Sequence, residues 1–197
     1  MDKYPQLRIF PEEIGERTRR PEVKNWKSRK LTTDEHSHGP LCNAPDGIYI
    51  VTLSERTPAE RFEMAHLLNL ASKGTRSTHA NGFVPADLYD SAIAVANGRV
   101  VGGAIADRGR TMRKTLELKS DGGYISGSAS GVEFRPFMWD LWVHPAHRQK
   151  GLGQQLLSAM AEHFECSVEQ MGFRFPISKE ARLLLWSMGL RKVEGRD

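Results

Sequence analysis

Short apolar runs alternate with polar and turn-forming segments along most of this chain, a pattern that predicts a mixture of strands and helices. Strands are expected where β-branched and apolar residues gather over about four to eight positions. Such runs cover residues 48–53, 91–96, 99–106, 115–118, 133–143, 168–175 and 190–193. Between the second and third runs, Asn97-Gly98 favours a tight hairpin turn, so these two strands should be antiparallel neighbours.

Other segments repeat their apolar residues at the spacing of a helix. One helix is expected to begin at Thr57-Pro58, because threonine is a good N-cap and proline is favoured in the first turn. Two more are predicted over residues 151–164 and 178–188, the last with Ser178 as its N-cap and Gly189 as its end. A short helical turn at 85–89 and polar loops at 74–82 and 121–131 complete the expected elements.

Residues 1–45 show little of this periodicity and are dense in charge and proline. We therefore predict two regions: a charged N-terminal extension over 1–45 without a core of its own, and a globular domain over 46–197. Basic clusters at 17–20 and 24–30 lie in the extension, the second around Trp26. A cationic patch with an aromatic ring suits nucleic acid, and the alternative is a solvated extension.

Composition narrows the class of protein without naming its chemistry. The net charge of +4 permits an acidic partner but does not require one. No apolar run approaches the roughly 20 residues that span a bilayer, and residues 1–5 lack the apolar core of a signal peptide. We expect a cytoplasmic protein without membrane contact. Cys42 and Cys166 are too few for a disulfide framework and are expected as reduced thiols.

The most informative segment joins the strand ending at Val143 to the helix beginning near residue 151. It carries the basic residues Arg148 and Lys150 beside Gly151 and Gly153. The first N–H groups of a helix have no partner within the helix, and with the helix dipole they attract anions, usually phosphate. Glycine lets a diphosphate approach the backbone closely. The alternatives are a generic phosphate-binding turn and a basic turn that binds nothing; the full Walker and Rossmann spacings are absent.

The pattern Val143-x-Pro145-x-x-Arg148-x-x-Gly151-x-Gly153 resembles the acetyl-CoA pyrophosphate loop of the GCN5-related N-acetyltransferases, the GNAT family. That family's signature is Arg/Gln-x-x-Gly-x-Gly/Ala after a strand ending in Val-x-Pro. The later helix from Ser178-x-x-Ala181 to Gly189-Leu190 is similar to a second family segment, in spacing more than in residues. The resemblance covers about residues 46–195. It implies an α/β fold, with a mixed, mostly antiparallel central sheet flanked by helices, the acyl-CoA N-acyltransferase fold.

The resemblance also implies the co-substrate and the residues that hold it. Acetyl-CoA would donate its acetyl group to a primary amine. Its diphosphate would be held by the loop residues Arg148, Gln149, Lys150, Gly151, Leu152, Gly153 and Gln154. Its pantetheine arm and acetyl carbonyl would be bound by the backbone of the preceding strand at Leu141, Trp142 and Val143. Ser178 replaces the family's asparagine, and its hydroxyl either bonds to pantetheine or only caps the helix.

The acetylated amine must lose a proton, and Asp140 is our candidate catalytic base. It is an ionisable residue within an apolar strand, where burial raises a carboxyl pKa toward the range of a useful base. The alternative is that Asp140 faces solvent or pairs with an arginine across the sheet. His144 is a second candidate base, or else His144 and His147 are exposed loop residues. No metal site is expected, because no further ligand lies near them in sequence.

The leaving thiolate must gain a proton, and here the sequence departs from the family. The tyrosine that many members carry in the last helix is replaced by Leu185, with Trp186 next to it. Tyr89, Tyr124 or solvent would then protonate the thiolate. The missing tyrosine also supports a second hypothesis, a CoA-binding module without turnover.

The acceptor is predicted only by class. The loops expected to line its site are 73–85 and 121–131. The basic extension favours a protein or another macromolecule over a small amine. A third hypothesis is a GNAT-like enzyme that modifies nucleic acid through that extension. A homodimer is compatible with the fold, although no feature of the sequence requires one.

Overall fold

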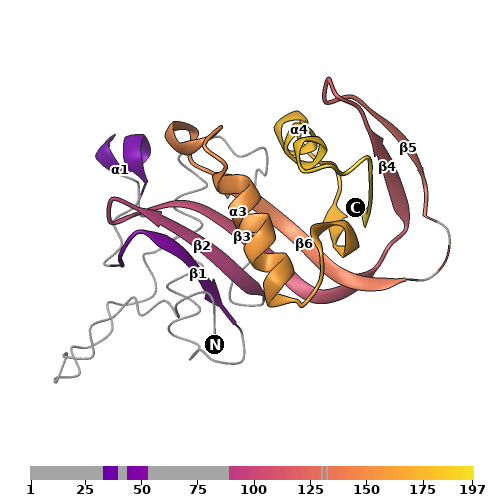
Figure 1. Ribbon diagram of the computed structural model, residues 1–197, viewed down its shortest axis with the longest axis horizontal. Coiled ribbons are helices and arrows are strands. Elements are labelled where there is room, and N and C mark those ends of the chain that lie inside the picture. The colour runs from indigo at the N-terminus through magenta and orange to yellow at the C-terminus, as the bar shows by residue number, and fades with distance from the viewer. Residues whose placement is uncertain (1–32, 40–43, 53–88, 130, 132) are drawn as a thin grey trace.

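The computed structural model describes residues 33–39, 44–52, 89–129, 131 and 133–197 (Figure 1). The strands within these ranges are β1 (Gly47–Val51), β2 (Asp90–Ala96), β3 (Arg99–Thr111), β4 (Lys114–Leu118), β5 (Tyr124–Ser128), β6 (Phe134–Val143), β7 (Gly172–Arg174) and β8 (Lys192–Arg196). The helices are α1 (Thr33–His38), α3 (Leu152–His163) and α4 (Lys179–Ser187), with short 3₁₀ turns η3 (Pro145–His147) and η4 (Val168–Gln170).

The described strands form one sheet in the order β1-β2-β3-β6-β7-β8-β4-β5. β6, β7 and β8 are parallel neighbours, and every other pairing is antiparallel. The expected mixed, mostly antiparallel sheet is thus confirmed. So is the β2–β3 hairpin: Asn97 and Gly98 both have positive φ, 53° and 65°, as the tight turn between such strands requires.

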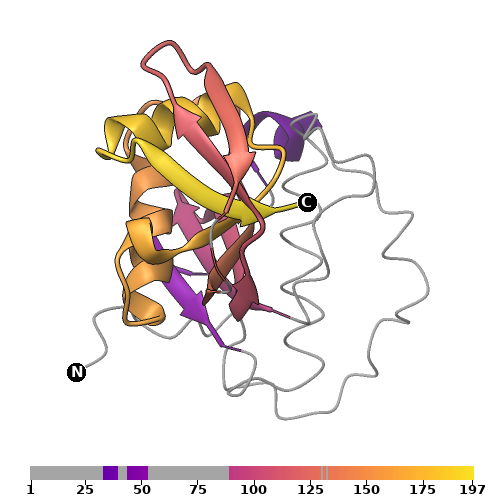
Figure 2. The ribbon, with the colours of Figure 1, turned by 90° about the vertical axis from the view of Figure 1, so that its right-hand side faces the viewer.

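Helices α3 and α4 lie on one face of the sheet (Figures 1 and 2). The amphipathic pattern of α3 explains its position, because its apolar stripe turns toward the strands. Leu156, Leu157 and Met160 are fully buried there, with Leu185 of α4 in the same core. The opposite face has a second apolar cluster that includes Trp142 and, at its margin, Trp139. The sheet therefore separates two cores, and strands β1, β2, β3 and β6 carry apolar residues on both faces.

Three predicted elements differ from the observed ones. The expected loop 121–131 contains β5, whose side chains are all exposed, so no apolar alternation marks it. The expected strand 168–175 shrinks to β7, because Ser167 and Gln170 form a capping box that starts η4 instead. The last strand lies at 192–196 rather than 190–193, since Leu190 is buried in the core after α4.

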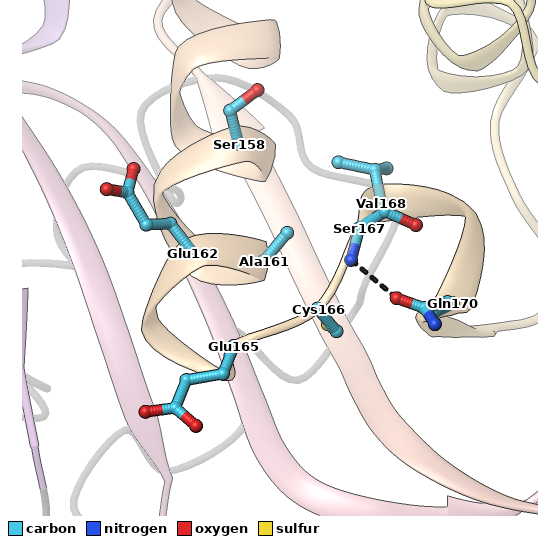
Figure 3. A pocket seen from close by; sticks show the side chains of 8 residues that line it. All are labelled: Ser158, Ala161, Glu162, Glu165, Cys166, Ser167, Val168 and Gln170. Carbon is cyan, nitrogen blue, oxygen red and sulfur yellow. Dashed lines mark hydrogen bonds between the residues drawn. The ribbon is translucent and has the colours of Figure 1, made fainter.

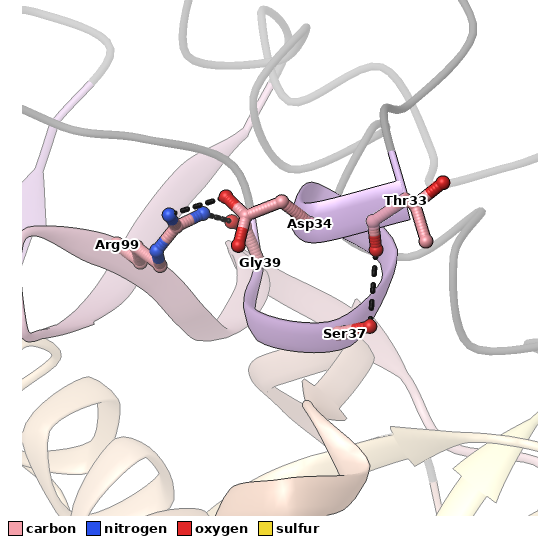
Figure 4. Close-up of polar contacts among 5 residues, drawn as sticks. All are labelled: Thr33, Asp34, Ser37, Gly39 and Arg99. Carbon is pink, nitrogen blue, oxygen red and sulfur yellow. Dashed lines mark hydrogen bonds and ion pairs between the residues drawn. The ribbon is translucent and has the colours of Figure 1, made fainter.

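The N-terminal helix α1 is attached to the sheet by Arg99, at the start of β3 (Figure 4). The Arg99 guanidinium donates to the Asp34 carboxylate at 2.5 Å and to the Gly39 carbonyl at 2.9 Å. Gly39 has φ +90°, and a Cβ there would lie 2.3 Å from the Val100 carbonyl oxygen. Only glycine fits this junction. Part of the predicted extension thus contacts the domain, while the boundary at residue 45 stays a prediction.

Several expectations fall outside the described residues. These are the helix beginning at Thr57, the acceptor loop 73–85 and the basic clusters at 17–20 and 24–30, together with the short turn at 85–89 except for Tyr89. Among the helices that the structure describes, none has the length and apolar character needed to cross a bilayer.

Candidate functional site

The site begins at an irregularity in β6. Ile105 of β3 lies opposite Asp140, whereas the next residue, Ala106, lies opposite Met138. Trp139 is therefore an extra residue, a β-bulge, and bulges bend a strand and increase its twist. On its other side β6 pairs with β7 only through Phe137 and Met138. From Trp139 to Val143 the edge of β6 that faces away from β3 has no partner among the described strands.

Alternation along the strand shows which backbone groups this open edge carries. The His144 N–H donates to the Val101 carbonyl of β3 at 2.8 Å, and Trp142 lies opposite Gly103. Residues of the other parity, Leu141 and Val143, therefore direct their N–H and C=O groups toward the open edge.

Side chains of this segment bind two of these four groups. The Leu141 N–H donates to Asp140 Oδ1 at 3.0 Å. The Val143 carbonyl accepts from Arg148 Nε at 3.0 Å. The predicted pantetheine strand thus has one donor and one acceptor ready on its open side, each held by a side chain that a ligand would displace.

The turn after β6 is organised by His144, which sequence reasoning placed among exposed loop residues or candidate bases. Its side chain is buried, and Nδ1 accepts from the Ala146 N–H at 3.2 Å, which caps η3. Pro145 occupies the first position of that turn. The imidazole therefore shapes the turn through Nδ1, and a polar side chain just before a proline was the available signal for this cap.

The loop from Arg148 to Gly151 then turns sharply into α3. Gln149 and Gly151 both have positive φ, 60° and 79°, and Gly151 is the N-cap of the helix. Lys150 Nζ donates to the Ala146 carbonyl at 2.9 Å, which closes the loop. A Cβ built on Gly151 would have Gln155 Nε2, at 3.9 Å, as its nearest described neighbour. The backbone at Gly151 is open to a ligand.

Gly153 has a different environment from Gly151. A Cβ on Gly153 would lie 3.0 Å from Leu184 Cδ2 of α4 and 3.7 Å from Val143 Cγ2. Its missing side chain lets α4 pack closely against the start of α3. The two glycines of the signature therefore do different things: one opens the backbone, and the other brings two helices together.

Positive charge accumulates around this loop. Burial lowers the pKa of His147 below its ordinary value of 6.5, and the nearby charges of Lys150, His144 and His38 lower it further. His38 belongs to α1, so the N-terminal helix contributes to the electrostatic environment of the loop. A bound anion would offset this repulsion, because opposite charge favours the protonated imidazole.

Ser178 is the N-cap of α4, as expected, and its Oγ accepts from the Ala181 N–H at 3.2 Å. Backbone hydrogen bonding at the helix start lowers the pKa of Glu180, with smaller contributions from the Ser178 hydroxyl and from the charges of Arg148 and Arg182. The Arg148 charge thus acts on the start of α4 while its side chain covers β6.

The candidate proton donors occupy very different places. Leu185, at the position of the family's tyrosine, is buried in the core, and Trp186 stacks with Arg191 at 3.7 Å. Tyr124 is exposed on β5 and lies 4.8 Å from the Arg182 guanidinium, on α4. Tyr89 packs against the indole of Trp139 with ring centroids 5.5 Å apart. Of these aromatic residues, Tyr89 is the one in contact with the bulge of β6.

A shallow hollow lies at the other end of α3 (Figure 3). It is lined by Ser158, Ala161, Glu162, Glu165, Cys166, Ser167, Val168 and Gln170. Its nearest lining residue on α3, Ser158, lies about 10 Å along the helix from Gly151. Cys166 carries a free thiol, and burial raises its pKa, which makes it a poor nucleophile. Among the described residues, no three His, Cys, Asp or Glu side chains gather as a metal site.

Comparison with known proteins identifies the family. Residues 51–171 match the model of the acetyltransferase (GNAT) family, which covers more than half of the chain. This protein belongs to the GNAT family. The match spans the strand, the turn and the helix that carry the predicted loop. No curated protein sequence matches the chain.

Solved structures of acetyltransferases share this GNAT fold. The xEco2 acetyltransferase domain is 17% identical, with a TM-score of 0.55 over 86% of this chain and 98% of that domain. The same domain bound to a K105-CoA conjugate gives 16% identity and a TM-score of 0.53, covering 77% of this chain and 93% of that one.

At these identities the structures show the fold alone, and the family match shows the class of enzyme. The GNAT protein described here is an acyltransferase of the acetyltransferase type, with the acyl-CoA N-acyltransferase fold that its loop predicted.

Proposed function

We propose that this GNAT protein transfers the acetyl group of acetyl-CoA to a primary amine. One observation carries the proposal: the open backbone edge at Leu141 and Val143 runs directly into the open turn at Gly151. Acetyl-CoA has the corresponding shape, because its extended pantetheine arm ends in a diphosphate. The arm would pair with a strand edge, and its charged end would reach helix N–H groups.

The loop residues Arg148 to Gln154 would hold the diphosphate. Gly151 would admit it to the backbone, and the positive charges of Arg148 and Lys150 would attract it. A pantetheine amide would replace Arg148 as the donor to the Val143 carbonyl. The Arg148 guanidinium would then be free to bind phosphate. Ser178 would contribute its hydroxyl at the start of α4, in addition to capping that helix.

The Leu141 N–H would bind the acetyl carbonyl oxygen once Asp140 has moved away from it. A hydrogen-bond donor at that oxygen stabilises the charge that develops during acyl transfer. Asp140, released from this contact, would take a proton from the acceptor amine, directly or through water. One carboxylate thus binds the oxyanion donor before the thioester does, and becomes the base once the thioester is in place.

The reaction forms a C–N bond and breaks a C–S bond. The amine nitrogen attacks the thioester carbonyl, the amine proton goes to Asp140, and the CoA thiolate leaves. With Leu185 in place of tyrosine, the thiolate takes its proton from solvent or from Tyr89, beside the bulge. The products are the acetylated amine and free CoA. The acceptor that we favour is a protein or another macromolecule rather than a small amine.

A different function is a CoA-binding module without turnover. The buried Leu185 favours it, because the core offers no phenol at that position. The test is a turnover assay that follows free CoA thiol in the presence of a panel of amines and peptides. We expect thiol release that depends on the amine and is lost in Asp140→Asn. Binding of acetyl-CoA without release for any amine would support the module instead.

A further inference from the structure

The face of the sheet opposite α3 carries an indole held in a fixed position. Trp139 Nε1–H donates to Asp107 Oδ2 at 3.1 Å. Phe137 contacts the ring edge-on at 5.0 Å, and Tyr89 packs against it at 5.5 Å. Trp139 is the bulged residue and directly precedes Asp140, so it adjoins the proposed reaction centre at Asp140 and Leu141 in the chain.

Two guanidinium groups converge on this ring. Arg110 Cζ lies 5.6 Å and Arg174 Cζ 5.9 Å from the ring centroid. Arg110 is held by a hydrogen bond from Nε to Asp107 Oδ2 at 2.8 Å, so its charge is partly compensated. Arg174 has no carboxylate partner within the described part of the chain.

A second uncompensated arginine lies next to Arg174. Arg196 is its register partner on β8, and residues in register share a face of the sheet. Arg196 Nε is buried and has no hydrogen-bond partner among the described residues. Like charges on paired strands repel each other. The arginine pair between β3 and β6 differs, because Arg135 is compensated by Glu133 and Glu194.

The acceptor amine has to approach from this face if the proposed function holds, on which this inference rests. Helix α3, whose N-terminus would bind the diphosphate, lies on the other face with the first core. We propose that Trp139, Arg110, Arg174 and Arg196 form an acceptor subsite that binds the acidic side chains of a peptide next to the acetylated amine.

The spread of the subsite favours a peptide over a small anion. Its arginines belong to β3, β7 and β8, which are separated by three strand spacings, about 14 Å across the sheet. An extended peptide covers that distance with about four residues. Asp107 and Glu194 interrupt the positive charges, so the surface suits separate carboxylates better than the continuous phosphates of a nucleic acid.

The test compares two peptides that share one lysine acceptor, flanked by Asp and Glu in one and by Asn and Gln in the other. We expect the full-length protein to acetylate the acidic peptide with about tenfold higher kcat/KM, the size of a charge-assisted hydrogen bond. Arg174→Gln should lower that preference while leaving the Kd for acetyl-CoA unchanged. Arg108→Gln, an exposed arginine on β3, removes the same charge and should keep the preference.

The subsite would be overturned by equal kcat/KM for the two peptides, or by an equal loss of the preference for the acidic peptide in Arg174→Gln and Arg108→Gln. It would also be overturned if single-stranded RNA displaced the acidic peptide at a lower concentration than the peptide needs to bind. Peptide binding to the CoA-loaded protein, followed by fluorescence anisotropy, separates this inference from the proposed function. Charge-dependent binding without turnover would keep the subsite and reject the transferase. Equal turnover of both peptides would keep the transferase and reject the subsite.

Discussion

Gly151 and Gly153 are two residues apart in one signature, yet they solve different physical problems. Gly151 has a positive φ and an open flank, which suits a ligand approaching the backbone. Gly153 has ordinary helical geometry, and its flank is filled by Leu184. From the sequence, both glycines were expected to admit a diphosphate. A motif shows that glycine is required at a position, but it does not show whether a ligand or a neighbouring side chain lies against that glycine.

Stability measurements should separate these roles. Gly153→Val would overpack the α3–α4 contact and is expected to lower the free energy of unfolding by about 1–3 kcal/mol. In Gly151→Ala the added methyl group has open space, so the loss of unfolding free energy should come only from the left-handed backbone conformation, about 1 kcal/mol. Urea denaturation of both variants measures the difference. A larger loss in Gly151→Ala than in Gly153→Val would contradict the assignment.

His147 links the loop to pH. Its pKa is lowered by burial and by the neighbouring positive charges, and a diphosphate nearby would raise it, so binding should take up a proton. We expect acetyl-CoA affinity to increase as pH falls from about 8 to 6, and this slope to flatten in His147→Gln. Calorimetric Kd values across that range measure it; identical slopes in both proteins would refute the linkage.

The same shift has the opposite sign for folding. A histidine whose folded pKa lies below its unfolded value binds fewer protons in the folded state, so its contribution to stability is present above pH 6.5 and is lost as pH falls below that value. We therefore expect the free energy of unfolding to be lower at pH 5.5 than at pH 7.5. This difference between the two pH values should be smaller in His147→Gln. Because His147 is only half-buried, the effect should be small.

Among the elements, the bulge in β6 does most to create the site. The extra residue bends the strand where its pairing with β7 ends, and the open edge results. The sequence predicted the strand and its burial but not the bulge, because an inserted residue leaves no trace in a run that is apolar on both faces. β5 was missed for a related reason, since its pairing with β4 is carried by backbone and all its side chains are exposed.

The docking of α1 can be tested as an element. Arg99→Gln should weaken its bonds to Asp34 and Gly39 by about 1 kcal/mol, which increases opening of α1 about fivefold. Hydrogen exchange of residues 33–38 would detect this, with Arg108→Gln as the control for charge. Unchanged exchange in Arg99→Gln would show that α1 is held by other contacts.

At the scale of the whole molecule, the order of the sheet decides what the sequence can and cannot predict. The strand, turn and helix of the CoA site are contiguous over 139–154, so a local motif was enough to predict them. The acceptor face combines Arg110, Trp139, Arg174 and Arg196, which the strand order β3-β6-β7-β8 brings together. β4 and β5 lie at the edge of the sheet next to β8 because β4 pairs with β8, which is far from it in the sequence. No local sequence pattern predicts that pairing.

Calorimetric titration of acetyl-CoA into the protein and into Gly151→Trp tests the proposed CoA site. We predict one site with a Kd of about 1 μM in the unaltered chain, weakened at least about 100-fold, or about 2.8 kcal/mol, by the indole in the turn. Gly131→Trp is the matched control, because Gly131 has a similar positive φ and nothing within 4 Å, and it should bind normally. No binding by the unaltered protein, or full binding by Gly151→Trp, would contradict the proposed site.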